Sequence, residues 1–350
     1  MRHSIKRQRK VRSTMNAKRI QSFMSQNVIY MVLAVLIIGI AIYDPSFLGL
    51  NPLRDILNQS STRVIIALGV AFVLITGGTD LSAGRIVGLS AVVSASMLQT
   101  TDYARRFFPD LGELPLFVPI LLAVVVGLIF GLINGVIVAK FKVPPFIATL
   151  GTMVAVYGVN SLYFDTAPNH SQPIGGLRPD FKEYFGTGSI GVGGVSIPII
   201  VVIAIAVACI VWIVFNQTRL GKNMYAIGGN QQAARVSGIN VGKNLVYIYA
   251  IAGALYGLAG VLEAARTGGA TNNYGNMYEL DAIAACVVGG VSTTGGIGTV
   301  PGVVTGVLIF TVINYGLTFI GVSPYWQLII KGSIIVAAVA FDMRKYAAKK

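Results

Sequence analysis

Charged residues are scarce in this sequence. They make up 11% of the 350 residues, while hydrophobic residues make up 54%. Soluble chains carry roughly 25% charged residues, so a soluble protein of this length would lack the charge to cover its surface. The composition therefore excludes a soluble multidomain protein and indicates an all-α polytopic membrane protein, and the 41 glycines suit closely packed membrane helices.

Residues that support metal or covalent chemistry are also rare. The two cysteines, Cys209 and Cys286, lie in apolar runs, so neither a disulfide framework nor a Cys-rich metal site is predicted. The two histidines, His3 and His170, have no ligand-like neighbours. We therefore predict no catalytic residue and no metal site. The chain also lacks a phosphate-binding loop of the G-x-x-x-x-G-K-[ST] type, so it is not expected to hydrolyse ATP.

Ten segments are apolar enough to be membrane spans, for which about 20 residues each are needed. They lie near residues 27–43, 62–78, 85–100, 114–139, 144–163, 196–215, 244–265, 279–290, 299–319 and 324–341. The eighth is short, because the glycine-rich stretch 289–298 interrupts a long uncharged run. No cleavage site follows the first, which we interpret as a retained anchor helix.

Basic residues set the orientation, and in a membrane protein the net charge of +14 is a topology signal rather than a sign of nucleic-acid binding. The N-terminal tail 1–26 carries eight Lys or Arg and the loop 216–243 carries four. Both termini are therefore expected in the cytoplasm, with a permease domain over 27–343 and a second basic tail at 344–350. The eight basic residues would also favour anionic membrane lipid. The loop 164–195 is expected outside.

The two halves of the chain share short matches. LIFGLIN at 128–134 corresponds to LIFTVIN at 308–314, VPPF at 143–146 to VSPY at 322–325, and TGG at 76–78 to TGG at 267–269. In the ten-span arrangement these matches predict inverted repeats of spans 2–5 and 7–10, a common plan in transporters. Apolar sequences also match by chance, which is the alternative.

The large cytoplasmic loop carries a pattern of small residues. Gln232-Ala233-Ala234-x-x-x-Gly238 resembles the EAA-x-x-x-G motif with which importer permeases contact their ATPase, although Ala250 and Ile251 replace its later Leu and Pro. Small residues let a short helix enter a cleft on a partner, and Gly238 permits the turn that ends it. The alternative is an ordinary basic loop. The predicted ATPase-coupling residues are Gly229, Asn230, Gln232, Ala233, Ala234, Arg235 and Gly238.

A second group consists of pathway or gate candidates. Asp80 follows a glycine pair that permits a break after span 2, and it is interpreted either as a gate or as part of a helix cap. In the second interpretation Thr79 and Ser82 cap the next helix and Asp80 lies near Arg85. Asn134 and Asn314 are expected either to bind a hydroxylated solute or to join helices.

Four further charges lie at or within apolar spans. Glu279 and Asp281 are two residues apart, so on a helix they point to different faces and do not form an acid–base pair. Both belong to the pathway or gate candidates, and the alternative, which we favour, is that they cap a helix end near Arg266. Glu263 and Lys331 are functional candidates because intramembrane charges are costly, although Lys331 is close enough to a helix end to snorkel.

Long gapless stretches carry a family resemblance that runs from about Tyr30 to Lys350. These stretches are TGGTDLSAG (76–84), VPPFIATLGTM (143–153), TRLGKNMYAIGGNQQAARVSGINV (218–241), YELDAIAACVVGG (278–290) and GTVPGVVTGVLIFTVINYGLTFIGVSPYWQ (298–327). They resemble the permease subunits of the ribose, xylose, arabinose and galactose branch of bacterial ABC sugar importers. Within that branch, the last two stretches are most similar to the galactose/methyl-galactoside members.

The resemblance implies an assembly in the bacterial inner membrane. Two copies of the chain would form the pore, and a cytoplasmic ATPase subunit with two nucleotide-binding domains, which uses ATP and Mg, would dock on the 218–243 loops. A periplasmic sugar-binding protein would deliver the sugar. The Gln232–Gly238 stretch would be the coupling helix.

Other functions remain open from the residues alone. A permease of the same branch for ribose, xylose or arabinose is one alternative, and a branched-chain amino-acid permease is a more distant one. An ion-coupled secondary transporter would use Asp80 or Glu263 as its proton site, but it would need no docking loop. A membrane-embedded enzyme is disfavoured by the scarcity of histidine.

Overall fold

The computed structural model describes residues 28–192 and 195–347, and its helices follow the apolar runs of the sequence. The longer helices are α2 (Val28–Tyr43), α3 (Leu50–Ile75), α4 (Ala83–Met97), α5 (Phe117–Lys140), α6 (Pro145–Asp165), α8 (Ile199–Gln217), α11 (Val241–Thr267), α13 (Val300–Phe319) and α14 (Pro324–Ala347). The shorter elements are η1 (Pro45–Leu48), α7 (Pro179–Lys182), η2 (Glu183–Thr187), β1 (Ser189–Val192), β2 (Val195–Pro198), α9 (Arg219–Gly229), α10 (Gln231–Val236) and α12 (Tyr278–Val288).

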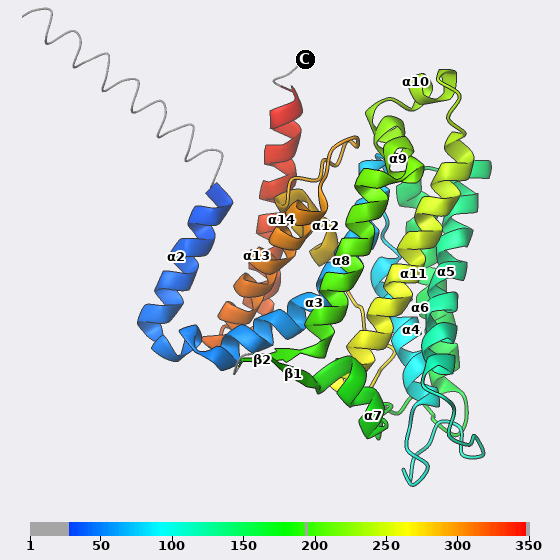
Figure 1. Cartoon of the computed structure of the whole chain (residues 1–350), viewed down its shortest axis with the longest axis vertical. Coiled ribbons are helices and arrows are strands. Elements are labelled where there is room, and N and C mark those ends of the chain that lie inside the picture. The colour runs from blue at the N-terminus through cyan, green and yellow to red at the C-terminus, as the bar shows by residue number, and fades with distance from the viewer. Residues whose placement is uncertain (1–27, 193–194, 348–350) are drawn as a thin grey trace, which may run out of the picture.

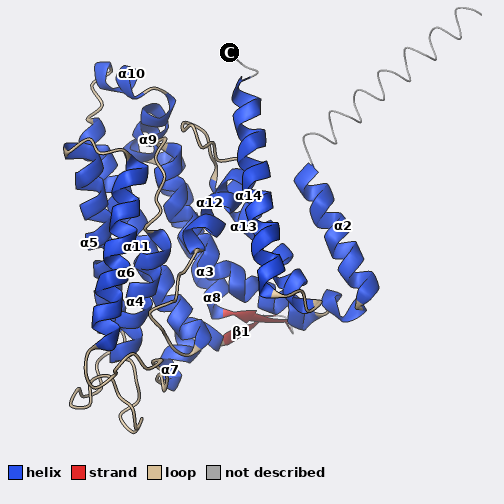
Figure 2. Cartoon of the chain, turned by 180° about the vertical axis from the view of Figure 1, so that it is seen from behind, coloured by secondary structure: helices blue, strands red, loops and turns tan. Residues whose placement is uncertain are grey.

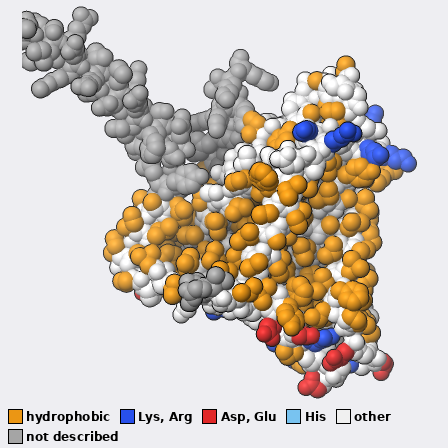
Figure 3. Space-filling view, in the orientation of Figure 1, with side chains coloured by type: hydrophobic (Ala, Val, Ile, Leu, Met, Phe, Trp, Pro, Cys, Tyr) orange, Lys and Arg blue, Asp and Glu red, His pale blue; other side chains and the backbone are white. Residues whose placement is uncertain are grey.

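The two ends of the molecule differ in structure and in charge. One end carries α9, α10 and the C-terminal end of α14, and the other carries α7 and the β1–β2 hairpin (Figure 1). Hydrophobic side chains form a broad band between them, with Lys and Arg above it at the α10 end and Asp and Glu at the opposite end (Figure 3). This is the surface of a protein that crosses a membrane.

Six helices in the described part of the chain are long and apolar enough to cross a bilayer: α3, α5, α6, α8, α11 and α13. A helix also occupies each of the other four positions at which the sequence predicts a span. Two of these, α4 and α12, are short. The 11 residues of α12 rise only about 16 Å, against a hydrocarbon core of about 30 Å. The eighth predicted span therefore does not cross the membrane as a single helix.

The core is built around α3 and α11, which contact each other. The second half of α3, from Ile65 to Ile75, is completely buried. The α11 backbone approaches α5 closely, since a Cβ on Gly253 would overlap the carbonyl oxygen of Gly127 and lie 2.8 Å from the Cα of Gly131. Small residues at four-residue spacing are the usual means of close helix contact in membranes.

The helix contacts of the two halves correspond. Helix α3 contacts α12 and α13, and α11 contacts α4 and α5. In the same way, α4 contacts α5 and α6, while α12 contacts α13 and α14. The turns also correspond, because Gly77 after α3 and Gly268 at the end of α11 both have positive φ, at 80° and 73°.

The starts of α4 and α12 meet inside this core. After α3, the non-helical segment 76–82 leads to α4, and after α11 the non-helical segment 268–277 leads to α12. A Cβ on Gly275 would overlap the carbonyl oxygen of Gly84, so the segment before α12 is in backbone contact with the first turn of α4. Two interrupted helices whose N-terminal ends converge are a feature of transporter folds.

The two strands of the described residues form one small hairpin, β1–β2, between α7 and α8 (Figure 2). Strands β1 and β2 pair antiparallel, with Ser189 opposite Pro198 and Gly191 opposite Ser196. The all-helical expectation is therefore correct for the membrane part and wrong for this small hairpin. The basic tail 1–26 lies outside the described residues, as do the last three residues of the 344–350 tail.

Candidate functional site

A buried polar centre surrounds Asp80, whose side chain is 1% exposed. Its Oδ1 accepts hydrogen bonds from the backbone N–H of Ser82 at 2.9 Å and from the Ser82 hydroxyl at 2.6 Å. Its Oδ2 accepts from the Tyr256 hydroxyl at 3.2 Å. The carboxyl group thus fixes the turn that starts α4 and ties it to α11.

Asn134 belongs to the same centre, because its amide donates to the Ser82 hydroxyl at 2.8 Å. Helix joining is therefore the role that its contacts support. Two polar atoms near this centre, the Asn134 Oδ1 and the Tyr249 hydroxyl, have no hydrogen-bond partner within the described chain. Because the Tyr249 hydroxyl and the Asn134 Oδ1 are unpaired, the hydrogen bonds around Asp80 can be exchanged for others without adding a new polar group.

The predicted neighbours of Asp80 need two corrections. Arg85 does not approach Asp80, because its guanidinium lies over the Tyr157 ring and donates to Asn276. Ser82 occupies the position before α4 but makes no side-chain cap, since its hydroxyl donates to Asp80 instead. The groups that donate hydrogen bonds to the Asp80 carboxyl belong to Ser82 and Tyr256 and are uncharged.

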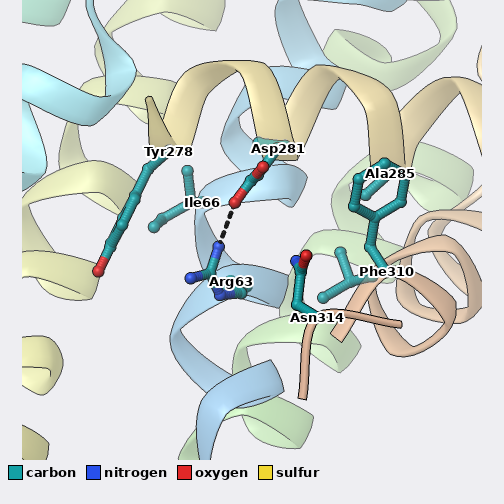
Figure 4. Close-up of a pocket in the computed structure, with 9 residues that line it drawn as sticks. Arg63, Ile66, Tyr278, Asp281, Ala285, Phe310 and Asn314 are labelled. Carbon is teal, nitrogen blue, oxygen red and sulfur yellow. Dashed lines mark hydrogen bonds and ion pairs between the residues drawn. The ribbon is translucent and has the colours of Figure 1, made fainter. Parts of the chain in front are cut away.

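A network of charges connects α3, α12 and α14. Oδ2 of Asp281 lies 2.7 Å from Nη1 of Arg63 (Figure 4). The same oxygen lies 3.1 Å from Nζ of Lys331. All three side chains are largely buried, at 13%, 26% and 21% exposure. Lys331 therefore does not snorkel, and Asp281 holds two cations rather than capping a helix beside Arg266.

Glu263 extends the network to α11. Its carboxylate pairs with Arg266 at 2.7 Å and accepts from the Thr62 hydroxyl at 2.9 Å and from the Tyr278 hydroxyl at 3.0 Å. The Arg63 guanidinium also lies 4.8 Å from the centroid of the Tyr278 ring. These contacts join helices from both halves of the chain, and they place Arg266 on Glu263 rather than on Glu279.

Asn314 lies beside this network, in a pocket lined also by Arg63, Asp281 and Phe310 (Figure 4). The pocket is small: its accessible volume of about 10 Å³ is roughly enough for one water molecule. The Asn314 Oδ1 has no partner among the described residues. The structure thus brings together two candidates, Asp281 and Asn314, at a point that is closed to any solute larger than water.

The loop 216–243 forms two short helices, α9 and α10. Asn230 caps α10 by accepting from the Ala233 N–H at 2.9 Å. At the other end, Gly238 has a φ of 84°, its N–H donates to the Arg235 carbonyl, and the Ile239 N–H donates to the Ala234 carbonyl. This is a Schellman motif, so the predicted role of Gly238 in ending the helix is confirmed.

The outer face of α10 is open to solvent. Gln232, Ala233, Arg235 and Gly238 are exposed, while Ala234 is buried. The sequence interpretation missed Val236, which is 91% exposed at the end of α10. An apolar side chain with this exposure on a polar loop is a docking candidate, and its position within the small-residue motif was the available signal.

The loop is connected to the interior through α9. The Tyr225 hydroxyl donates to the Gly298 carbonyl at 2.8 Å, and the Gly296 N–H donates to the Ile75 carbonyl at the end of α3. A cavity of about 340 Å³ separates α10 from the turns after α3 and α5. Gln231 and Arg235 line its outer part and Tyr249 lines its inner part.

Comparison with known proteins identifies this arrangement. Residues 53–339 match the model of a family described as the branched-chain amino acid transport system/permease component. The chain belongs to this family of transport permeases. No solved structure matches it.

Named relatives of the permease transport sugars. The galactose/methyl galactoside import permease protein MglC of Haemophilus influenzae is 56% identical over 327 residues, which cover 93% of this chain and 96% of that relative. The protein of the same name from Escherichia coli K12 is 55% identical over 338 residues, covering 97% and 100%. The ribose import permease protein RbsC of Bacillus subtilis is 40% identical over 319 residues, covering 91% and 92%.

Proposed function

We propose that this permease is the membrane subunit of an ABC importer for galactose and methyl galactoside. The observation that carries the proposal is the identity of 55–56% to two permeases named for those sugars, over almost the entire length of both chains. The permeases named for ribose are clearly more distant, at 37–40% identity. Galactose is therefore preferred over ribose as the substrate.

The permease has ten membrane segments, with both termini in the cytoplasm of a bacterial cell and the permease domain over 27–343. What supports this topology is a helix at each predicted position and the basic end formed by α9 and α10. Helices α3–α6 and α11–α14 form the inverted repeats. Their support is the matching set of helix contacts and the two positive-φ glycines after α3 and α11.

A separate ATPase subunit, which holds ATP and Mg, docks on α10 and moves it. The exposed small face of α10 and Val236 fit a cleft on such a partner. Motion of α9 reaches Gly298 and the end of α3 through the hydrogen bonds of Tyr225 and Gly296. From there, the turn held by Asp80 transmits the motion to α4.

A second copy of the chain completes the pathway, and a sugar-binding protein in the periplasm delivers substrate to the acidic end. The single chain leaves many large apolar side chains of α6 exposed, among them Phe146, Ile147, Val154 and Leu162. Lipid and a second permease together account for such a surface. The permease itself needs no high-affinity sugar site, because selection occurs in the binding protein.

Uptake in a bacterial strain that lacks its own galactose importers tests the proposal. The permease is expressed alone and then with the ATPase and binding protein of its own system, and labelled galactose is supplied with or without excess ribose. We expect uptake only with all three proteins, with no competition by ribose, and its loss when the phosphate-loop lysine of the ATPase is mutated. Uptake by the permease alone, collapsed by a protonophore, would refute the ABC assignment.

A further inference from the structure

A polar patch lies against the middle of α6. The Arg85 guanidinium carbon lies 4.3 Å from the centroid of the Tyr157 ring, and Nη2 donates to the Asn276 Oδ1 at 2.7 Å. Tyr157 is about 18 Å along α6 from Pro145 and about 12 Å from Asp165, at 1.5 Å per residue. Because α6 spans the membrane, Arg85 and Asn276 lie near the centre of the bilayer.

The patch is open on the surface of the single chain. Asn273 and Asn276 are exposed, and the Tyr157 ring is 40% exposed. Asn273 and Asn276 belong to the non-helical segment 268–277, which leads into α12. Lipid cannot satisfy the polar groups of irregular backbone, which occurs at membrane depth only when buried in protein or when it lines a water-filled path. This face therefore does not contact lipid. The unpaired polar atoms beside it suit a water-filled pathway better than a protein contact.

Unused hydrogen-bonding capacity adjoins the patch. Glu279 is 7% exposed, lies against the Gly84 backbone next to Arg85, and its Oε2 has no partner among the residues described. Asn160 is 1% exposed and donates to the Asn272 carbonyl, but its Oδ1 is likewise unpaired within the described segments. Nη1 of Arg85 is also buried without a partner there. Buried unpaired polar atoms are costly, so water or a polar ligand is expected to bind them.

The chemistry of the group suits a neutral sugar. An aromatic ring packs against the C–H face of a pyranose, and a guanidinium offers paired donors to two neighbouring hydroxyls. Amide and carboxyl oxygens accept from the remaining hydroxyls. A cation and a carboxyl side by side nearly balance in charge, which disfavours an anion. We propose that Arg85, Tyr157 and Asn276, with Glu279 beside them, form a transient monosaccharide contact site in the translocation pathway.

This inference rests on the proposed function, which supplies the sugar. Transport and sugar-stimulated ATP hydrolysis are measured in proteoliposomes that contain the complete transporter. Arg85→Ala is expected to lower galactose transport about tenfold or more, since a hydrogen bond to a charged group is lost, while ATP hydrolysis persists. Arg85→Lys should be intermediate, Tyr157→Phe should transport nearly normally, and Tyr157→Ala should be impaired.

A matched control is Tyr247→Ala. Tyr247 is 48% exposed and also lies under a cation, with Lys243 Nζ 5.7 Å from its ring centroid, but it lies near the start of α11 rather than mid-membrane. The Tyr247→Ala transporter should transport galactose normally. If Arg85→Ala lowers transport and ATP hydrolysis in parallel, or leaves both unchanged, the site is wrong. If the wild-type transporter moves another sugar but not galactose, the proposed substrate fails and the site is tested with that sugar.

A labelling experiment covers the case in which Arg85 variants do not fold. Asn276→Cys is placed in a Cys209→Ser background and treated with a membrane-impermeant thiol reagent during turnover, and modification is located by peptide mass spectrometry. We expect labelling about tenfold faster than at Leu162→Cys, an exposed apolar position on α6, and slowing by excess galactose. An Asn276→Cys variant that does not react, or whose labelling galactose does not change, would overturn the proposal.

Discussion

Asp281→Asn is the substitution for which the structure makes the sharpest stability prediction. A single oxygen of Asp281 holds both Arg63 and Lys331, and these three side chains are mostly buried. Removing the negative charge leaves Arg63 and Lys331 facing each other without the carboxylate that pairs with both of them. Breaking a buried ion pair costs about 3–5 kcal/mol, and we expect the lower end, about 3 kcal/mol, because both cations retain some exposure.

The sign of the coupling with Lys331 tests the cause of this loss. Lys331→Met alone should cost less than about 1 kcal/mol, because Asp281 keeps its 2.7 Å contact with Arg63. Lys331→Met should also partly rescue Asp281→Asn, since one of the two unpaired cations is then gone.

Reversible unfolding of the purified permease in mixed detergent micelles measures these free energies. The double variant should be more stable than Asp281→Asn alone. A loss below about 0.5 kcal/mol for Asp281→Asn, or strictly additive losses in the double variant, would show that the network does not hold these helices together.

Three further predictions concern packing, docking and pH. Gly253→Val should destabilise the permease by more than about 2 kcal/mol in the same unfolding assay, because its side chain overlaps the α5 backbone, whereas Gly39→Val, with open space around it, should not. Val236→Asp should weaken binding of the ATPase subunit at least about tenfold without changing permease stability, and normal co-purification would show that α10 is not the docking surface. Arg178 lowers the pKa of the Asp180 carboxyl through hydrogen bonds. Their pairing therefore stabilises the segment 178–187 at any pH above the ordinary Asp pKa of about 3.9. This stabilisation is lost as the pH falls through the lower pKa of the folded state. The protection of the amides over 178–187 against exchange, taken relative to the intrinsic rate at the same pH, should therefore fall as the pH drops below the ordinary Asp value, and in Asp180→Asn it should already be lower at pH 7. Equal protection in Asp180→Asn and wild type at pH 7 would contradict this.

Helix positions were the most predictable feature, because apolar runs such as 117–140 and 199–217 have one stable form in a bilayer. The helix of the second span extends well before the predicted start near residue 62, since α3 begins at Leu50. Its first turns carry Arg54, Asp55 and Asn58, and a search for apolar residues excludes them.

The partners of the polar residues were much harder to predict, because they are distant in sequence. Arg63 and Asp281 are 218 positions apart, and Asp80 and Tyr256 are 176 apart. Local spacing favoured Arg85 for Asp80 and Arg266 for Asp281, and both were wrong. The cost of an unpaired charge in the membrane was nevertheless a usable signal, since Arg63, Asp281 and Lys331 are isolated charges that need one another.

The β1–β2 hairpin had a sequence signal that was overlooked. Gly193 and Gly194 separate two short runs of alternating apolar residues, SIGV and VSIP, which is a typical hairpin pattern. In contrast, the end of α10 was predicted correctly from Gly238, because the positive φ that closes a helix is a local requirement that glycine meets best.

ATP-dependent accumulation of galactose in sealed proteoliposomes tests the central claim most directly. The permease is reconstituted with its ATPase and binding protein, with ATP and the ATPase on one side of the membrane and the loaded binding protein on the other. The account predicts that galactose accumulates against its gradient on the ATP side, which is the side of α9 and α10, and only while ATP is hydrolysed. Accumulation that requires a proton gradient and proceeds without ATP or the ATPase would contradict it.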